Sequence, residues 1–314
     1  MYRKNIFLGL FFVTHVAFSQ SFKIVPLGVS GGIDESNLSA YLISEPHSQA
    51  YLCLDAGTLH SGIKNYFQKN KIKKEASDFL KNNIKAYFIS HPHFDHSSGL
   101  IINSPDDSSK NIYAARFVIE AFKKHIFSWD TWANFANEGD EPKIGKYQYQ
   151  YLNENQWTSV EGTAFSIQLS YLSHTGRDLS SAILVKNSQD DYFLYLGDTG
   201  SDEIEKTSQL EDLWKKITPI IKNKKLKGIA IECSYANDQP DSRLYGHLKP
   251  NLLIKEIEKL EHWATLEALK EVKIIITHIK PKEGILKKIK EELSPLDKKG
   301  IKIVFAEQGK IINL

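Results

Sequence analysis

The sequence predicts an α/β protein in which strands and helices pack as layers around a shared core. After residue 20, short β-rich apolar runs alternate with stretches of helical periodicity through both halves of the chain. Apolar residues make up 41% of the 314 residues, which is too many for a disordered polymer, and no repeat, linker or low-complexity tract divides them. Two cysteines cannot staple a small secreted scaffold, so a packed core has to hold the fold.

The expected strands are runs rich in β-branched and aromatic residues, and the expected helices repeat apolar residues every three or four positions. In chain order, the strands are expected at Phe22–Leu27, Leu38–Ile43, Ala50–Leu54, Lys85–Ile89, Phe165–Leu172, Ala182–Val185, Tyr192–Leu196, Gly228–Ile231, Val272–Ile276 and Ile301–Phe305. Helical periodicity is clearest at Lys206–Lys222, Lys249–Leu260 and Gly284–Glu292.

The stretch from about residue 105 to 160 departs from this pattern because aromatic and polar residues are mixed in it. We expect a helical, aromatic-rich insertion with a short β element. Its aromatic side chains are expected to pack as a satellite core. The alternative is an aromatic wall beside a substrate base, for which Trp129, Trp132 and Phe135 are the nearest candidates.

Residues 1–19 are expected to be a signal peptide. Arg3 and Lys4 precede an apolar run, and Ala17-Phe18-Ser19 gives a small-x-small cleavage site before Gln20. A membrane anchor is the alternative, but the apolar run falls short of the roughly 20 residues that span a bilayer. We therefore expect a single domain, residues 20–314, in the periplasm or outside the cell.

The balance of charges excludes several classes of partner. The chain carries 40 Lys and Arg against 38 Asp and Glu, and loss of Arg3 and Lys4 would leave 38 against 38. A neutral chain without a basic tract has no electrostatic footprint for a nucleic-acid polymer or an anionic membrane, so we expect a small substrate. A homodimer stays open, since the sequence does not indicate the oligomeric state. Cys53 and Cys233 lie in strand-like apolar surroundings and are expected to be buried thiols.

The chemistry is indicated by SHPHFDHSSGL, residues 90–100, directly after an expected strand. Residues two apart in an extended segment point the same way, so His91 and His93 can share one metal. Where the chain turns into a helix, Asp95 and His96 can serve a second metal. The alternative is a solvated polar loop, but three histidines and a carboxylate within six positions are rarely collected by chance.

Three later strand ends offer further ligands. His174, Asp198 and His278 each follow an apolar strand-like run. A single histidine after a strand is more often a hydrogen-bonded loop residue, so each position alone is weak. Together, and in this order, they indicate a dinuclear metal site.

These motifs resemble the metallo-β-lactamase superfamily, in which H-x-H-x-D-H is followed by His, Asp and His. The resemblance implies a four-layer αββα sandwich with two divalent metal ions at one edge of the paired sheets. Zinc suits a site rich in imidazole, and manganese or iron stay open. The resemblance further implies that Asp55 supports the ligand-bearing segment without itself binding a metal. The implied ligands are His91, His93 and His174 for one ion, Asp95, His96 and His278 for the other, and Asp198 as the bridge.

The longer stretch HPHFDHSSGLIINSP resembles the signature of class II 3′,5′-cyclic-nucleotide phosphodiesterases. The stretches SGGIDESNLSAYL, IECSY and YGHLKP agree with that family, so the resemblance covers essentially the whole mature chain. Phe94 and Ser97 depart from it, because aliphatic residues are usual at both positions.

The family resemblance implies hydrolysis of a 3′,5′-cyclic nucleotide, above all cyclic AMP, to the 5′-monophosphate by a water that a metal pair activates. Candidate catalytic residues are Asp95, Glu232 and His247. Glu232 would orient His247, which would protonate the leaving ribose oxygen. The alternative for His247 is a loop histidine bonded to backbone.

Two other classes of function stay open. One is a different hydrolase on the same scaffold, such as a lactonase, β-lactamase, arylsulfatase or other phosphodiesterase. The other is a periplasmic binding or sensor protein with a structural metal. A set of seven ligands argues against the second class, since structural zinc sites are usually closed and mononuclear.

Overall fold

In the computed structural model, which describes residues 20–176 and 178–314, two seven-stranded sheets pack face to face. Both sheets mix parallel and antiparallel pairs. The first sheet has the order β14 (Ile312–Asn313), β1 (Lys23–Gly28), β2 (Ala40–Ser44), β3 (Tyr51–Leu54), β4 (Ile84–Ile89), β5 (Lys110–Ala115) and β6 (Tyr147–Leu152). The second has the order β13 (Lys302–Phe305), β12 (Lys273–Thr277), β11 (Leu226–Glu232), β10 (Tyr192–Leu196), β9 (Asp178–Lys186), β8 (Ser166–His174) and β7 (Trp157–Ser159).

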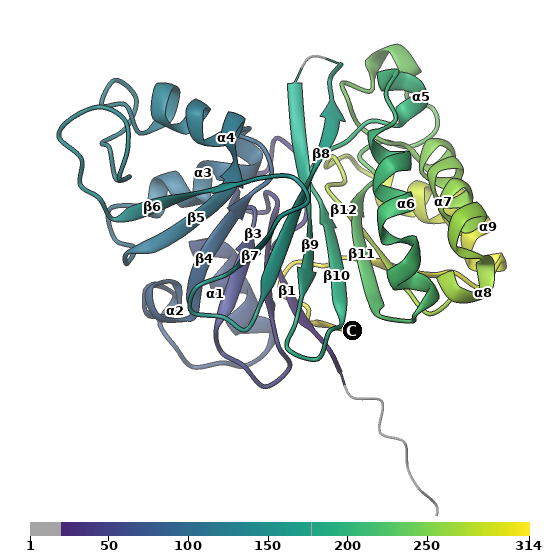
Figure 1. Cartoon of the computed structure of the whole chain (residues 1–314), viewed down its shortest axis with the longest axis horizontal. Helices are drawn as coiled ribbons and strands as arrows, with labels where there is room; N and C mark the ends of the chain where they lie inside the picture. Colours follow the sequence, from purple (N-terminus) through teal and green to yellow (C-terminus); the bar gives the residue numbers. More distant parts are fainter. Residues whose placement is uncertain (1–19, 177) are drawn as a thin grey trace, which may run out of the picture.

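Helices form the outer layer on each side of the paired sheets (Figure 1). The first sheet is flanked by α1 (His60–Lys69), α2 (Ala76–Asn83), α3 (Phe94–Asn103), α4 (Arg116–Ala121) and the π-helical turn η1 (Phe122–Ile126). The second is flanked by α5 (Asp202–Glu205), α6 (Gln209–Lys222), α7 (Pro250–Ala264), α8 (Leu266–Leu269) and α9 (Ile285–Lys298), with a short 3₁₀ turn η2 (Asp241–Arg243) before α7. The expected αββα sandwich is confirmed.

Aromatic contacts between the sheets fix their relative position. The ring centroids of Tyr41 on β2 and Tyr195 on β10 lie 5.8 Å apart. Phe22 before β1 contacts Phe193 of β10, with ring centroids 6.2 Å apart. All four rings are buried, and offset aromatic pairs add to the free energy gained from burial alone. These contacts therefore fix the position of the strand ends of one sheet relative to those of the other.

The strands expected from the sequence are all present within the described residues, but the stretch from 105 to 160 contains more strand than expected. It contributes β5 and β6 to the first sheet and β7 to the second, beside the short helix α4. In β6, YQYQYL alternates Tyr and Gln, and Tyr147 and Tyr149 face the core. This alternation was a strand signal that the aromatic-rich composition masked. The expectation of a mainly helical insertion is corrected accordingly.

Expectations for the cysteines and for the N-terminal segment can be compared with the described residues. Cys53 and Cys233 are buried free thiols, as expected. The expected signal peptide, residues 1–19, lies outside the described residues. Within the described ranges, no helix combines the length and apolar character that crossing a membrane requires.

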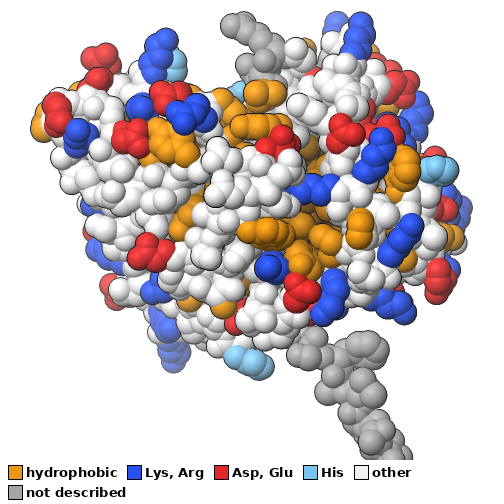
Figure 2. All heavy atoms as spheres, in the orientation of Figure 1, with side chains coloured by type: hydrophobic (Ala, Val, Ile, Leu, Met, Phe, Trp, Pro, Cys, Tyr) orange, Lys and Arg blue, Asp and Glu red, His pale blue; other side chains and the backbone are white. Residues whose placement is uncertain are grey.

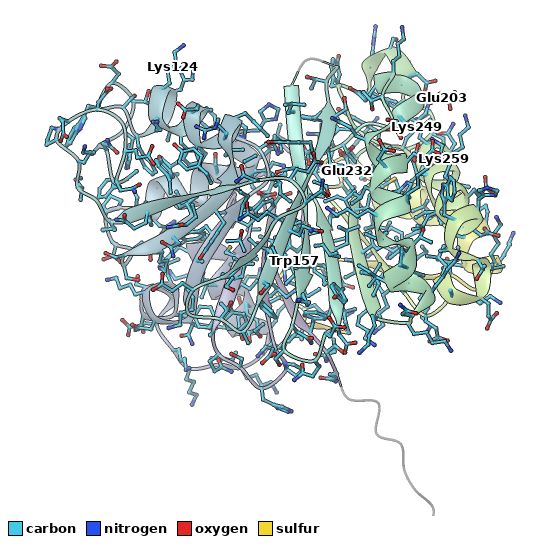
Figure 3. The ribbon with its side chains drawn as sticks, viewed as in Figure 1. Lys124, Trp157, Glu203, Glu232, Lys249 and Lys259 are labelled. Carbon is cyan, nitrogen blue, oxygen red and sulfur yellow. The ribbon has the colours of Figure 1, made fainter. Side chains whose placement is uncertain are left out.

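On the face shown in Figure 2, Lys and Arg side chains are interspersed with Asp and Glu around the rim, and hydrophobic side chains gather in the centre. Trp157 of β7 is labelled at this centre in Figure 3, and its side chain is partly exposed beneath the Lys186 ammonium, 4.8 Å from the ring centroid. This mixed face agrees with the near-neutral composition.

Candidate metal centre

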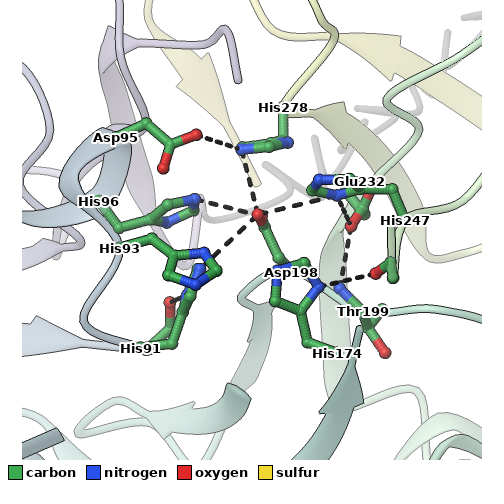
Figure 4. A network of polar contacts seen from close by, with 12 residues as sticks. His91, His93, Asp95, His96, His174, Asp198, Thr199, Glu232, His247 and His278 are labelled. Atoms are coloured by element: carbon green, nitrogen blue, oxygen red, sulfur yellow. Dashed lines mark hydrogen bonds and ion pairs between the residues drawn. The ribbon is translucent and has the colours of Figure 1, made fainter. Parts of the chain in front are cut away.

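The ends of β4, β8, β10, β11 and β12 meet at one edge of the sandwich. β10, β11 and β12 are parallel, and β8 runs in the same direction as β10 because both are antiparallel to β9. Their carboxyl ends therefore lie together. Figure 4 shows the side chains that converge there, and Glu232 is labelled in Figure 3 between the two outer helical layers. The residues gathered at this edge include all seven expected metal ligands.

Three histidines form a first group of donors. The ligand atoms of His91, His93 and His174 all lie within 4.8 Å of one another. His91 and His93 come from the segment after β4, and His174 is the last residue of β8. Three imidazoles converging on one point are a common donor set for a divalent transition metal.

A second group forms around Asp198, after β10, with ligand atoms again within 4.8 Å. Asp198 Oδ1 lies 3.2 Å from His96 Nε2, and Oδ2 lies 3.2 Å from His278 Nε2. Oδ2 is also 3.7 Å from Nε2 of His91, a member of the first group. Asp95 completes the second group, with Oδ2 3.2 Å from His278 Nε2. One carboxylate thus lies between the two groups.

In four of these histidines the Nδ1 atom is held by the protein. His96 Nδ1 donates to Asp55 Oδ2 at 2.8 Å, and His174 Nδ1 donates to the Gly246 carbonyl at 2.8 Å. His91 Nδ1 lies 3.0 Å from Ser90 Oγ. His278 Nδ1 lies 2.9 Å from Ser234 Oγ. Since both serine hydroxyls donate to carboxylates, each ring donates to its serine and keeps its Nε2 lone pair.

The free lone pairs fit metal ions. Nε2 of His91 and Nε2 of His96 are buried and have no hydrogen-bond partner among the described residues. Leaving such polar atoms unsatisfied in a protein interior is costly, and coordination to a metal satisfies them. A histidine that binds a metal through one ring nitrogen usually donates the N–H of its other ring nitrogen to a carboxylate or a carbonyl. The donor set therefore fits divalent metal ions.

Asp55 stabilises the segment that carries the first ligands. Its Oδ1 accepts from Ser90 N at 2.7 Å, and its Oδ2 accepts from Ser90 Oγ at 2.8 Å. The same Oδ2 accepts from His96 Nδ1 and, at 2.7 Å, from Tyr195 Oη of the second sheet. The expected support by Asp55 is present, and one buried carboxylate ties the ligand segment to both sheets.

The surroundings of His91 and Asp198 favour the protonation states in which these two side chains can bind a metal. Burial and the neighbouring His96 hold the pKa of His91 well below its usual value, so its imidazole is neutral. Burial opposes ionisation of Asp198, but His278 and His96 outweigh it and hold the pKa of that carboxyl well below its usual range. A neutral imidazole and an ionised carboxylate are the forms that bind metals.

Glu232 and His247 form a separate buried pair next to the metal-ligand groups. Glu232 Oε1 accepts from His247 Nδ1 at 2.8 Å and from Thr199 N at 2.9 Å. Its Oε2 accepts from Ser234 Oγ at 2.6 Å and from Leu248 N at 3.2 Å. Glu232 and His247 lie close enough to Asp198 and His278 to count as a third potential metal group. However, four hydrogen bonds use the acceptor positions of a carboxylate, so Glu232 is suited to orienting His247.

The environment of His247 differs from that of a backbone-bonded loop histidine. Its ring stacks on His278, with centroids 5.1 Å apart and planes at 25°. Burial alone would lower the pKa of His247, but Glu232, followed by Asp198, raises it above its usual value. The ring is thus held by a carboxylate at Nδ1 and favours the protonated form.

Several supporting residues were not identified from the sequence. Ser90, Tyr195 and Ser234 bond to Asp55, Glu232 or a ligand histidine. Gly246 has φ +76°, and a Cβ there would lie 2.7 Å from His174 Nδ1. Ser234 and Gly246 lie in the family-like stretches IECSY and YGHLKP, so a signal was present without a role attached to it.

The aromatic residues considered for a wall beside a substrate base do not lie at this site. Trp132 Nε1 donates to Ser104 Oγ at 3.0 Å, at the C-terminal end of α3, whereas Asp95 and His96 lie at its N-terminal end. Phe135 is buried in the core, and Trp129 Nε1 donates to the Pro142 carbonyl. Ten residues of helix, about 15 Å, separate the two ends. The satellite-core interpretation of this stretch is therefore favoured.

Comparison with known proteins agrees with this geometry. The model of the family described as class-II cAMP phosphodiesterases matches residues 21–309. A 3′,5′-cyclic-nucleotide phosphodiesterase of Aliivibrio fischeri is 40% identical over 305 residues, covering 93% of this chain and 92% of the relative. A probable 3′,5′-cyclic-nucleotide phosphodiesterase of Yersinia pestis is 37% identical over 304 residues, covering 92% of this chain and 88% of the relative.

Solved structures share the fold. Unliganded yeast PDE1 superimposes with a TM-score of 0.83 at 20% identity, covering 94% of this chain and 100% of the yeast chain. A metallo-beta-lactamase fold protein of Bacillus subtilis gives a TM-score of 0.63 at 15% identity, covering 93% of this chain and 99% of that chain.

Proposed function

This chain belongs to the family of class II cAMP phosphodiesterases, and we propose that it hydrolyses 3′,5′-cyclic nucleotides to 5′-nucleoside monophosphates at the centre around Asp198. The observation that carries this proposal is the position of Asp198, whose carboxylate lies within 3.7 Å of histidines from both donor groups. The buried Nε2 atoms of His91 and His96, which make no hydrogen bond within the described residues, support a metal-dependent reaction.

Two divalent ions are proposed for this centre. His91, His93 and His174 would hold one ion, Asp95, His96 and His278 would hold the other, and Asp198 would be shared between them. Zinc is the proposed metal, since five of the seven donors are imidazoles. When bound, such a pair supplies an activated water at neutral pH and neutralises charge on the phosphate.

The protein's own groups would position the ligands and move one proton. Gly32 N donates to Asp95 Oδ2 at 2.9 Å, which fixes the carboxylate on the rim of the centre. Glu232 holds His247 through Nδ1, so Nε2 of that ring is directed to another partner. We assign His247 Nε2 as the proton donor to the ribose 3′ oxygen, a poor leaving group without protonation. Glu232 then stabilises and orients the donor without contacting the substrate.

The Asp198→Ala variant tests the metal-dependent reaction. We expect wild-type protein to hold about two metal ions per chain and to turn over cyclic AMP. Asp198→Ala should lose the second ion and nearly all activity, because the shared carboxylate holds both charges close together. The exposed carboxylate of Asp212 on α6 provides the control, and Asp212→Ala should keep both metal and activity. Full activity in Asp198→Ala would refute the mechanism.

The same assay distinguishes the remaining hydrolase classes. Lactones, β-lactams and aryl sulfates lack a cyclic phosphodiester and should not be turned over. Rapid turnover of one of them, without turnover of any cyclic nucleotide, would place the chain in a different branch of the fold family.

Export is a separate part of the proposal. The basic start, the apolar run and the Ala17-Phe18-Ser19 sequence support cleavage near Gln20 and a periplasmic or secreted protein. The intact mass of protein recovered from the periplasm or medium decides this. An exported form that retains Met1 would contradict it.

A further inference from the structure

A hollow of about 510 Å³ opens directly beside the metal centre. Its volume lies within the range of about 300–1,000 Å³ that small-molecule sites occupy. The lining residues are Gly32, Leu38, Pro92, His93, Phe94 and Asp95. Two of them, His93 and Asp95, belong to the donor groups, so the hollow adjoins the metal centre.

Phe94 is the large apolar side chain of this lining. It is the first residue of α3, lies between His93 and Asp95 in the chain, and leaves 67% of its area exposed. A single exposed apolar residue is ordinary on a protein surface. An exposed aromatic ring between two metal-site residues is different, because it lines the hollow that contains those two residues.

Gly32 and Leu38, from the loop between β1 and β2, complete the lining of the hollow. Gly32 N donates to Asp95 Oδ2, so the loop is tied to the metal centre. Leu38, farther along the same loop, therefore adds apolar surface to the lining that contains Phe94.

We propose that Phe94 binds the base of the substrate by stacking, an inference that rests on the proposed phosphodiesterase function. With the cyclic phosphate at the metals, the ribose carries the base away from them, and the hollow beside His93 and Asp95 receives it. Base stacking on an aromatic ring is favourable for every base, since each has a π face.

The lining also predicts weak discrimination between bases. Apart from His93 and Asp95, which serve the metals, it contains no side chain with a donor or acceptor for the edge of a base. Selection by hydrogen bonds needs such groups. Cyclic AMP and cyclic GMP should thus have similar kcat/KM values, while cyclic UMP, whose smaller ring stacks less, should have a higher KM.

The test compares Phe94→Ala and Phe94→Trp with a matched control on the same helix. Ile102 is also 67% exposed but lies near the other end of α3, where it lines a separate hollow with Asn103 and Asp106. The substrates are cyclic AMP and the base-free methyl riboside 3′,5′-cyclic phosphate, and the bound metal is counted in every variant.

For Phe94→Ala we expect the KM for cyclic AMP to rise about 10- to 100-fold, the loss expected from removing one stacking ring. Metal content, kcat and the KM for the base-free substrate should stay close to wild type. Phe94→Trp should restore the KM, and Ile102→Ala should leave every value unchanged. An unchanged KM for cyclic AMP in Phe94→Ala, or an equal rise for the base-free substrate, would overturn the assignment. Absence of cyclic AMP turnover in metal-loaded wild type would instead refute the proposed function.

Discussion

Substitution of Asp55 by Asn tests the buried support of the metal centre. The exchange removes a charge and little else, because Asn matches Asp in size and tolerates the positive φ of 53° found at this position. Asp55 is fully buried, and its two oxygens accept from Ser90 N, Ser90 Oγ, His96 Nδ1 and Tyr195 Oη.

The cost follows from the number of donors around the carboxylate. The best placement of Asn turns its amide nitrogen toward Ser90 N, which leaves that buried N–H unsatisfied at about 1–3 kcal/mol. The remaining three bonds lose their ionic partner, and each is weakened by about 1 kcal/mol. The sum, about 4–6 kcal/mol, is a large part of the roughly 5–15 kcal/mol that stabilises an ordinary domain. The weaker hold on His96 should also lower metal affinity about 10- to 100-fold.

Denaturant unfolding of the metal-free protein and metal titration of the folded protein measure the two effects separately. Tyr195→Phe is the control, since it removes one hydrogen bond to Asp55 and keeps the charge. It should cost about 1–2 kcal/mol and leave metal affinity near wild type. If Asp55→Asn unfolds at the wild-type midpoint and binds metal with wild-type affinity, the reasoning about this carboxylate is wrong.

Three further predictions concern the site. His247→Ala should slow cyclic AMP hydrolysis about 10²- to 10⁴-fold, and bis(4-nitrophenyl) phosphate far less, because nitrophenolate leaves without a proton; equal losses in steady-state rates would assign His247 to binding or folding. Gly246→Ala should abolish metal-dependent activity, since the new Cβ would lie 2.0 Å from Thr175 N, whereas Gly145→Ala, with a similar φ of +69° and nothing within 4 Å, should stay active. Dialysis against a chelator should lower the melting temperature and added Zn²⁺ should restore it, because ligands that bind only the folded state stabilise it; an unchanged melting curve would count against a metal at this edge.

The sequence was most informative where a residue's role depends on its place at the end of a strand. His174 ends β8, whereas Asp198 and His278 follow β10 and β12, and these three strands run in the same direction in one sheet, which brings their carboxyl ends to one edge. The spacing in the segment after β4 made His91 and His93 neighbours for the same local reason. Local periodicity therefore placed these residues at strand ends, and the family resemblance implied that they form one set of ligands.

The hydrogen bonds that hold the ligand residues in place depend on packing between the sheets, and local sequence patterns do not encode that packing. Tyr195 reaches Asp55 only because β10 packs across from the segment after β3. Strand β5 lies in the stretch expected to be mainly helical, and it begins with Lys110, a charged residue that is rarely buried. In the fold Lys110 is buried and paired with Asp107, which also accepts from Tyr87 Oη of β4 at 2.7 Å. A lysine can occupy such a position only when a distant partner is present, and the sequence alone does not reveal that partner.

In the proposed reaction, the centre around Asp198 opens the bond from phosphorus to the 3′ oxygen of a cyclic nucleotide. Identification of the product formed from cyclic AMP by metal-loaded wild-type protein tests it most directly. We expect 5′-AMP alone, since His247 is assigned to protonate the 3′ oxygen as it leaves. Formation of 3′-AMP, or recovery of unreacted cyclic AMP from protein that holds its full complement of metal, would contradict it.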